Sequence, residues 1–146
     1  MELKCYQSLP DILSIEKIAL MFNEVLESYQ KNQRDKEIFL KILSVLTERQ
    51  TMTYKILAED LRERIDKELC KLWNTDSYDD VDTILYIVVN LGLEKCFTLA
   101  KNSIMTISNL SPSIKSEIED TINEVGNHIL NPYHELDEMN SRNEKE

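Results

Sequence analysis

Apolar residues recur at every third or fourth position along most of this chain, the spacing that gathers them on one face of an α-helix. Three such stripes fill the first half, and polar stretches at 30–35 and 47–51 separate them. We therefore expect three amphipathic helices here, with their charged side chains on the outer faces. The stripes consist of Ile15, Ile18, Ala19, Phe22, Val25, Leu26 and Tyr29, then Ile38, Phe39, Ile42, Leu43, Val45 and Leu46, then Tyr54, Leu57, Leu61, Ile65, Leu69 and Leu72.

A fourth apolar segment follows four aspartates in the run WNTDSYDDVDTILYIVVN, residues 73–90. Ser77 suits the N-cap of a helix, and Asp80, three residues later, is a short version of the capping-box acid. Gly92 can take the left-handed conformation that ends a helix. The pattern therefore predicts a helix from Ser77 to Gly92, apolar nearly all round and buried at the centre of the fold.

The remaining pattern predicts two more helices. One runs from Leu93 to about Ser108. The other opens at Ser111, a cap residue, followed by Pro112 in the first turn, where its missing N–H costs nothing. We expect this last helix to end at residues 131–132, Asn-Pro. The inward-facing residues of the two helices are Cys96, Phe97, Leu99, Ala100, Ile104 and Ile107, then Ile114, Ile118, Ile122, Val125 and Ile129.

The fold class follows from these elements and from what the chain lacks. With two glycines and three prolines, it is poor in the turn residues that sheets require. The sequence predicts an all-α protein of about six helices stacked as antiparallel pairs. Both a short HEAT-like solenoid and a compact helical bundle fit this pattern. We expect one domain over residues 1–136 and a polar tail over 137–146.

Charge narrows the choice of partner. The net charge is −10, and the acid excess lies in two blocks, 56–82 with nine acids against four bases and 117–146 with nine against two. Because nucleic acids and anionic membranes are bound mainly through Lys and Arg, we expect neither as a partner. A protein with a basic surface suits this distribution. No secretion signal is evident, and the longest apolar run, 84–93, is about half a membrane span, so we expect a cytoplasmic protein.

Candidate chemistry is sparse. The chain has no glycine-rich phosphate loop and no nucleophile motif. Cys5, Cys70 and Cys96 form no CxxC pair, which favours reduced, mostly buried thiols over zinc ligands or a disulfide framework. Of the two histidines, His128 and His134, the second stands near several acids but without the HExxH spacing. We predict no catalytic residue, no metal site and no cofactor. A small enzyme that uses His134 with nearby carboxylates is an alternative.

The aspartates of residues 76–82 have three explanations: helix capping, a partner-binding patch, or carboxylates that converge for metal or acid–base work. Tyrosine and tryptophan beside carboxylates make good interface anchors. Trp73 and Tyr86 also suit the core, and Tyr78 also suits a staple at the helix start. A second acidic and aromatic group surrounds Tyr133. The candidate partner-binding residues are Trp73, Asp76, Tyr78, Asp79, Asp80, Asp82, Tyr133 and Glu135.

The runs LWNTDSYDDVDTILYIVVNLGLEK (72–95) and EIEDTINEVGNHILNPYHEL (117–136) carry a resemblance. An acidic and aromatic helix start before an apolar helix, with Pro-Tyr near the C-terminus, resembles the small all-helical immunity proteins that bacteria encode beside secreted polymorphic or contact-dependent toxins. The resemblance implies a cytosolic protein that blocks a cognate toxin at its active site or an exosite. Many such toxins are nucleases with basic grooves, which an acidic inhibitor would match. We expect a non-enzymatic binding protein of this kind, with a helical adaptor or regulatory module as the alternative.

Overall fold

The computed structural model describes residues 3–32, 35–126 and 128–130, and within these ranges the chain forms seven helices and no strand. The all-α prediction is confirmed. The boundary expected between domain and tail at residue 136 lies outside the described residues. The helices are α1 (Leu3–Gln7), α2 (Ile15–Asn32), α3 (Lys36–Thr51), α4 (Glu59–Leu72), α5 (Tyr78–Leu91), α6 (Glu94–Thr106) and α7 (Pro112–Val125).

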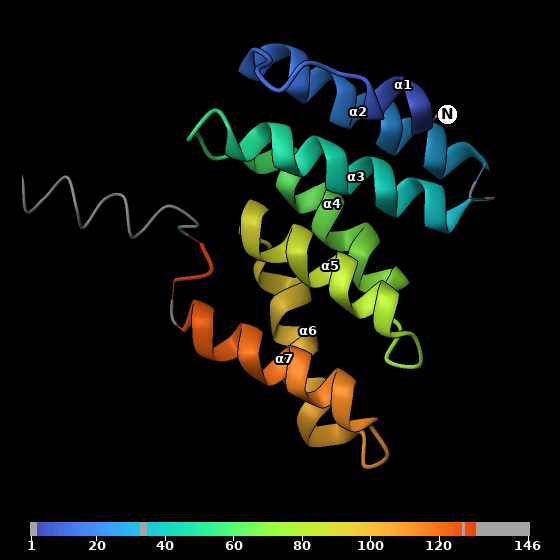
Figure 1. The fold of residues 1–146 in the computed structure, drawn as a ribbon, viewed down its shortest axis with the longest axis vertical. Helices are drawn as coiled ribbons and strands as arrows, with labels where there is room; N and C mark the ends of the chain where they lie inside the picture. The colour runs from blue at the N-terminus through green and yellow to red at the C-terminus, as the bar shows by residue number, and fades with distance from the viewer. Residues whose placement is uncertain (1–2, 33–34, 127, 131–146) are drawn as a thin grey trace, which may run out of the picture.

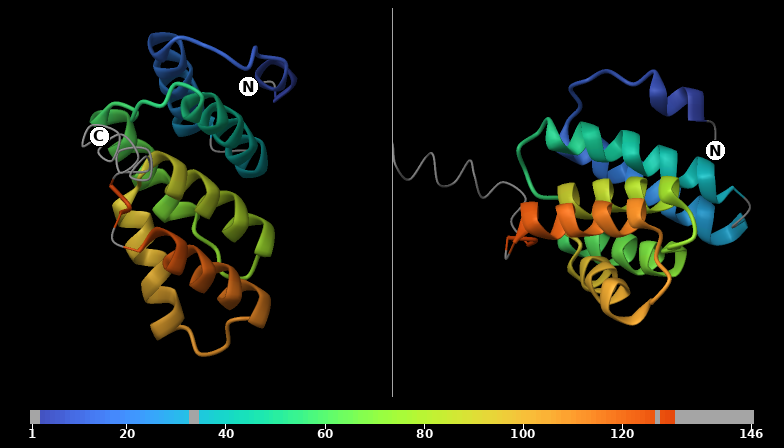
Figure 2. Two further views of the ribbon diagram at one scale, coloured as in Figure 1. Left: turned by 60° about the vertical axis from the view of Figure 1, so that its left-hand side comes forward. Right: turned by 60° about the horizontal axis from the view of Figure 1, so that its bottom comes forward.

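The helices form two layers (Figures 1 and 2). In one layer α3 packs against α5, and α5 packs against α7; in the other α2 packs against α4, and α4 against α6. α2 and α3 form an antiparallel pair, and the short α1 packs on α3. Alternate helices thus occupy alternate layers, which is the order of a short α-solenoid. The helices also pack compactly, so the arrangement fits a helical bundle as well.

The core has two parts that meet at α5. The larger cluster joins α2, α3, α4, α5 and the start of α6, and it includes the stacked rings of Tyr29 and Phe39, whose centroids are 4.0 Å apart. The smaller cluster lies between α5, α6 and α7 and consists of Val81, Leu85, Ala100, Ile114 and Ile118. α5 contributes to both clusters and packs between α3 and α7, so it is the central helix of its layer, as its nearly continuous apolar sequence predicts.

The predicted caps are confirmed, with one correction. The Ser77 hydroxyl accepts the Asp80 N–H at 3.3 Å, and Ser111 caps α7 by accepting the Ile114 N–H at 3.4 Å. Gly92 ends α5 at φ 74°, ψ 54°. The capping box at Ser77 is incomplete, however. The Ser77 N–H donates to the Asn74 carbonyl at 3.4 Å, and the Asp80 carboxylate forms an ion pair with Lys36 on α3 instead.

Two helix boundaries differ from the prediction. α4 begins at Glu59, so Tyr54 and Leu57 precede it; Tyr54 lies in a turn with φ 54° and an exposed ring. The Gln50 side-chain amide donates to the Lys55 carbonyl at 2.7 Å and holds this segment as a loop. α7 ends at Val125, because Gly126 follows it with φ 58°. Ile129 therefore lies beyond the helix, although it still packs against the larger cluster.

The N-terminal segment contains a helix that the pattern did not predict, the five-residue α1. α1 packs on α3, and the segment that follows α1 is tied to α3 by Arg49, whose side chain is almost fully buried. The Arg49 guanidinium donates to the carbonyls of Leu9 and Pro10 at 3.0 and 3.1 Å. These bonds satisfy a charge that burial would otherwise penalise, and they fix the chain between α1 and α2.

Candidate functional site

A shallow groove of about 220 Å³ runs between α5 and α7, and we call it the acidic groove. Of the described residues that line it, three are acidic and none is basic. Apolar side chains from α5 contribute to the lining beside the carboxylates. The lining residues are Asp82, Leu85, Tyr86, Val89, Asn90, Glu117, Thr121 and Glu124.

Helical spacing gathers these side chains. On α5, Asp82, Tyr86 and Asn90 follow one another at intervals of four residues, which stacks them on one face. On α7, Glu117 and Glu124 are seven residues apart and share a face for the same reason. The packing of α7 against α5 then brings the two faces together, as the neighbouring ribbons in Figure 1 show. The groove is a product of tertiary packing between segments far apart in the sequence.

The electrostatic centre of the groove is the pair formed by Asp82 and Glu117. Partial burial raises the pKa of Glu117, and the neighbouring Asp82 carboxylate raises it further, by accepting a hydrogen bond from the protonated form and by its charge. The Tyr78 hydroxyl opposes this, since it donates to Glu117 Oε2 at 3.3 Å and lowers the pKa. Asp120 adds a smaller repulsion. The groove therefore brings together two carboxyl groups whose mutual repulsion a bound cation would relieve.

The aromatic residues near the aspartates differ in their roles. Tyr78 is 44% exposed and Tyr86 is 39% exposed, so the core interpretation of Tyr86 is wrong. The negative charge of Glu117 is the main cause that raises the pKa of Tyr78, and burial chiefly raises that of Tyr86. Trp73 is half-buried against both core clusters, and its indole N–H donates to Ser103 Oγ at 2.9 Å. The core interpretation of Trp73 is confirmed.

The four aspartates of the 76–82 run have different partners, although three of them line one hollow. Asp80 points to α3 and pairs with Lys36, while Asp82 lines the acidic groove on the other side, next to α7. Asp79, Asp80 and Asp82 also line a hollow between α3 and α5, together with Glu37 and Lys41 of α3. Asp76 precedes the helix and lies exposed in the loop, where its N–H donates to Asn74 Oδ1 at 3.0 Å. Of the predicted set, Asp82 and Tyr78 are therefore the residues associated with Glu117.

Other predicted residues lie outside the groove or outside the described chain. Tyr133 and Glu135, and the alternative catalytic residue His134, fall in the segment 131–146, beyond the described residues. Glu117 and Glu124 are groove residues that the sequence reading did not single out. Their seven-residue spacing on a predicted helix was the available signal, but it could not indicate which helix they would face.

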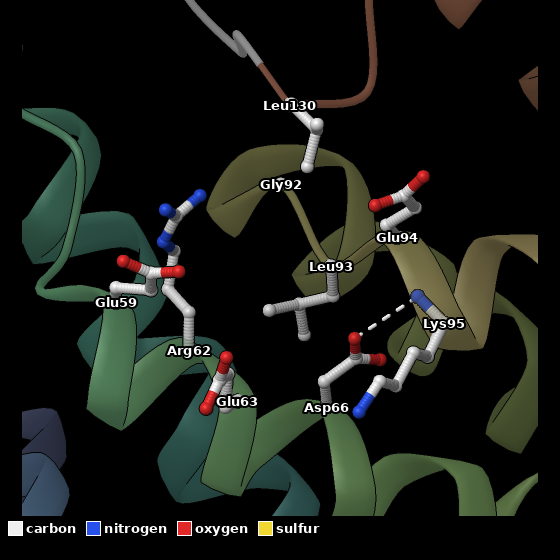
Figure 3. A pocket seen from close by; sticks show the side chains of 9 residues that line it. All are labelled: Glu59, Arg62, Glu63, Asp66, Gly92, Leu93, Glu94, Lys95 and Leu130. Atoms are coloured by element: carbon white, nitrogen blue, oxygen red, sulfur yellow. Dashed lines mark hydrogen bonds between the residues drawn. The ribbon is translucent and has the colours of Figure 1, made fainter.

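A second hollow, of about 140 Å³, lies where α4 meets the start of α6 (Figure 3). Asp66 lies at its edge, and its carboxylate accepts the Lys95 N–H at 3.0 Å and the Cys96 N–H at 2.8 Å. Arg62 and Glu63 line the same hollow from α4. Both acids and bases line this hollow, so it lacks the uniform sign of the acidic groove.

The chain matches no protein-family model, no curated protein and no solved structure. Within the described ranges, none of the helices combines the length and the apolar character needed to cross a membrane.

Proposed function

We propose that this protein is a non-enzymatic binding domain whose acidic groove receives a basic side chain from a partner protein. The observation that carries the proposal is the Asp82–Glu117 pair, two carboxylates that line one groove, in which Asp82 raises the pKa of Glu117 and whose described lining contains no base. Like charges held together cost free energy in the isolated protein. A bound cation would remove that cost.

Arginine is the side chain that suits this pair best. Its planar guanidinium can donate to two carboxylates at once, and it is more weakly hydrated than an ammonium group. The stem of the side chain would lie along Leu85 and Val89, and the exposed ring of Tyr86 offers a surface for stacking. The acid excess of 117–146 and 56–82 would accelerate the encounter with a basic partner.

The specific form of the proposal is a toxin-neutralising immunity protein, in keeping with the resemblance of residues 72–95 and 117–136. In that role the groove would bind an arginine from the basic substrate site of a toxin. A helical adaptor that binds a basic segment of another protein would use the same groove. The two roles differ in the partner, because an immunity protein protects a cell against the toxin encoded beside its own gene.

The groove can be tested without a known partner. We would titrate isotope-labelled protein with N-acetyl-arginine amide and follow the backbone amide resonances of α5 and α7. N-acetyl-citrulline amide, which has nearly the same shape but no charge, is the matched ligand control. We expect arginine to shift the resonances around Asp82 and Glu117, and citrulline to leave them unchanged. Equal shifts with both ligands would refute a charge-dependent site.

Variants locate the site. Glu117→Gln should weaken arginine binding by roughly tenfold, which is the loss of one charge-assisted hydrogen bond of about 1.5 kcal/mol. Glu119→Gln is the control, because it makes the same charge change on the exposed face of α7, where Glu119 faces Lys115 at 4.0 Å. If both variants weaken binding equally, only net charge matters and the groove is not the site. The immunity role is tested separately, by whether co-expression protects cells from the product of the adjacent gene.

A further inference from the structure

Three metal-ligating side chains converge between α4 and α6, away from the acidic groove. Asp66 and Cys70 belong to α4 and Cys96 to the first turn of α6; one ligand atom from each lies within 4.8 Å of the other two. Cys96 is fully buried, Asp66 is 6% exposed and Cys70 is partly exposed. The group is therefore a built cluster, reached from solvent on the Cys70 side.

Local and tertiary structure both contribute to this convergence. Asp66 and Cys70 are four residues apart, so they lie one turn above one another on the same face of α4. α6 starts at Glu94, and its N-cap residue, Leu93, has a side chain without an acceptor. The Asp66 carboxylate replaces it by accepting the N–H groups of Lys95 and Cys96 (Figure 3 shows the bond to Lys95). This contact fixes the first turn of α6, and with it the Cys96 thiol, against α4.

The spacing of the atoms suits a tetrahedral ion. With Zn–S bonds of about 2.3 Å and a Zn–O bond of about 2.1 Å, tetrahedral ligands lie roughly 3.6–3.8 Å apart. The Cys70 Sγ and Asp66 Oδ1 atoms are 3.9 Å apart, and all three ligand atoms lie within 4.8 Å of one another, so a bound ion would draw the side chains together by no more than about 1 Å. Two sulfurs and one carboxylate oxygen favour zinc over Mg²⁺ and Ca²⁺, which prefer oxygen ligands.

We propose that Asp66, Cys70 and Cys96 form a binding site for Zn²⁺ or a similar thiophilic divalent cation. In the metal-free protein the Cys70 thiol donates to Asp66. On binding, the ion replaces the thiol protons of Cys70 and Cys96, and both protons pass to solvent. Two new Zn–S bonds and one Zn–O bond form, and a water can fill the fourth position. Burial raises the pKa of the Cys96 thiol in the metal-free protein, so its proton leaves only when the ion takes its place. The ion would join α4 to α6.

The test uses the full chain, reduced and freed of metal with a chelator that is then removed. Titration with Co²⁺ should give one equivalent of binding, with a thiolate-to-cobalt charge-transfer band and strong visible bands of a tetrahedral complex. Zn²⁺ should abolish these bands by displacement. Zn²⁺ added to the metal-free protein should release about two protons, detected with an indicator dye in weak buffer, because two thiols are deprotonated.

Cys70→Ser should abolish the charge-transfer band, and Cys5→Ser, at the remaining cysteine, should retain it. A folded wild-type protein without the band at one equivalent of Co²⁺ would overturn the proposal. So would a band of full strength in Cys70→Ser, or one that disappears in Cys5→Ser. If circular dichroism shows that Cys70→Ser does not fold, the wild-type protein is tested instead. Its cysteines are alkylated with and without Zn²⁺, and the labelled positions are identified by mass spectrometry. Zn²⁺ should then protect Cys70 from the reagent while Cys5 still reacts, and equal labelling of Cys70 with and without Zn²⁺ refutes the site.

Discussion

Replacement of Asp66 by alanine should be the most damaging single change to a polar residue that we can identify. Asp66 is 6% exposed, and it supplies from α4 the cap that α6 cannot make for itself. Asp66→Ala leaves the N–H groups of Lys95 and Cys96 without their acceptor in a buried position. The substitution therefore removes two bonds and also the negative charge at the positive end of the α6 dipole.

The size of the effect follows from these contacts. A hydrogen bond to a charged group contributes about 1.5–3 kcal/mol, and loss of an N-cap costs about 0.5–2 kcal/mol. The two figures describe overlapping interactions, so we expect a loss of about 2–4 kcal/mol in the free energy of unfolding. For a chain of this length that corresponds to a decrease of roughly 5–15 °C in Tm. Asp66→Asn keeps one acceptor oxygen and should lose about half as much.

Urea unfolding followed by circular dichroism, in the presence of chelator and reductant, measures this loss without any metal contribution. Glu63→Ala is the matched control, because Glu63 is an exposed acid one turn earlier on α4; it should change stability by no more than about 0.5 kcal/mol. Hydrogen exchange should become faster at the amides of Lys95 and Cys96 in Asp66→Ala. If Asp66→Ala is no less stable than Glu63→Ala, the carboxylate is not the cap of α6.

Three further changes test other parts of the structure. Because the folded-state pKa of Glu117 lies above its ordinary value of 4.5, its protonated form favours folding below that value and the benefit is lost as the pH rises. Glu117→Gln should therefore be more stable than wild type at pH 7 but not at pH 4 in urea melts; an advantage that persists at pH 4 would exclude this cause. Gly126→Ala should cost about 1–2 kcal/mol from its positive φ alone, since none of the described residues has an atom within 4 Å of an added Cβ; an unchanged melting curve would mean that the backbone there relaxes freely. Trp73→Phe should cost about 1–2 kcal/mol in the same assay, because the buried Ser103 hydroxyl loses the indole N–H; no loss would show that this bond contributes little.

The fold could be predicted largely because its signals are local. Apolar stripes at helical spacing predicted six of the seven helices in the described part of the chain, and Ser77, Gly92 and Ser111 start or end helices through contacts only a few residues away. The errors arose at helix boundaries that are set by a distant residue or by a competing local signal. The start of α4 depends on Gln50, which holds the preceding segment as a loop. The end of α7 depends on Gly126, a local signal that the longer apolar stripe obscured.

The candidate sites were harder to predict because both arise between helices. Asp82 was among the predicted residues, but its neighbour Glu117 lies 35 positions later and meets it only because α7 packs on α5. The Cys70–Cys96 pair has the same origin. Its sequence separation resembles no metal motif, and only the packing of α4 against α6 brings the thiols together. Sequence periodicity indicates which face of a helix is apolar, but it does not specify the neighbouring helix.

The aspartates at the start of α5 show how one short segment can contact both helices that flank a central helix. Because α5 lies between α3 and α7, acids in its first turns that are two positions apart point to different partners. Asp80 meets the cation of Lys36 on α3, which is a stabilising contact. Asp82 meets the acid Glu117 on α7, which is an unfavourable one. A carboxylate already neutralised within the protein has little left to offer a partner, whereas a repelled pair gains from any cation that arrives. For this reason we assign the binding role to the α7 side of α5 rather than to the aspartate run as a whole.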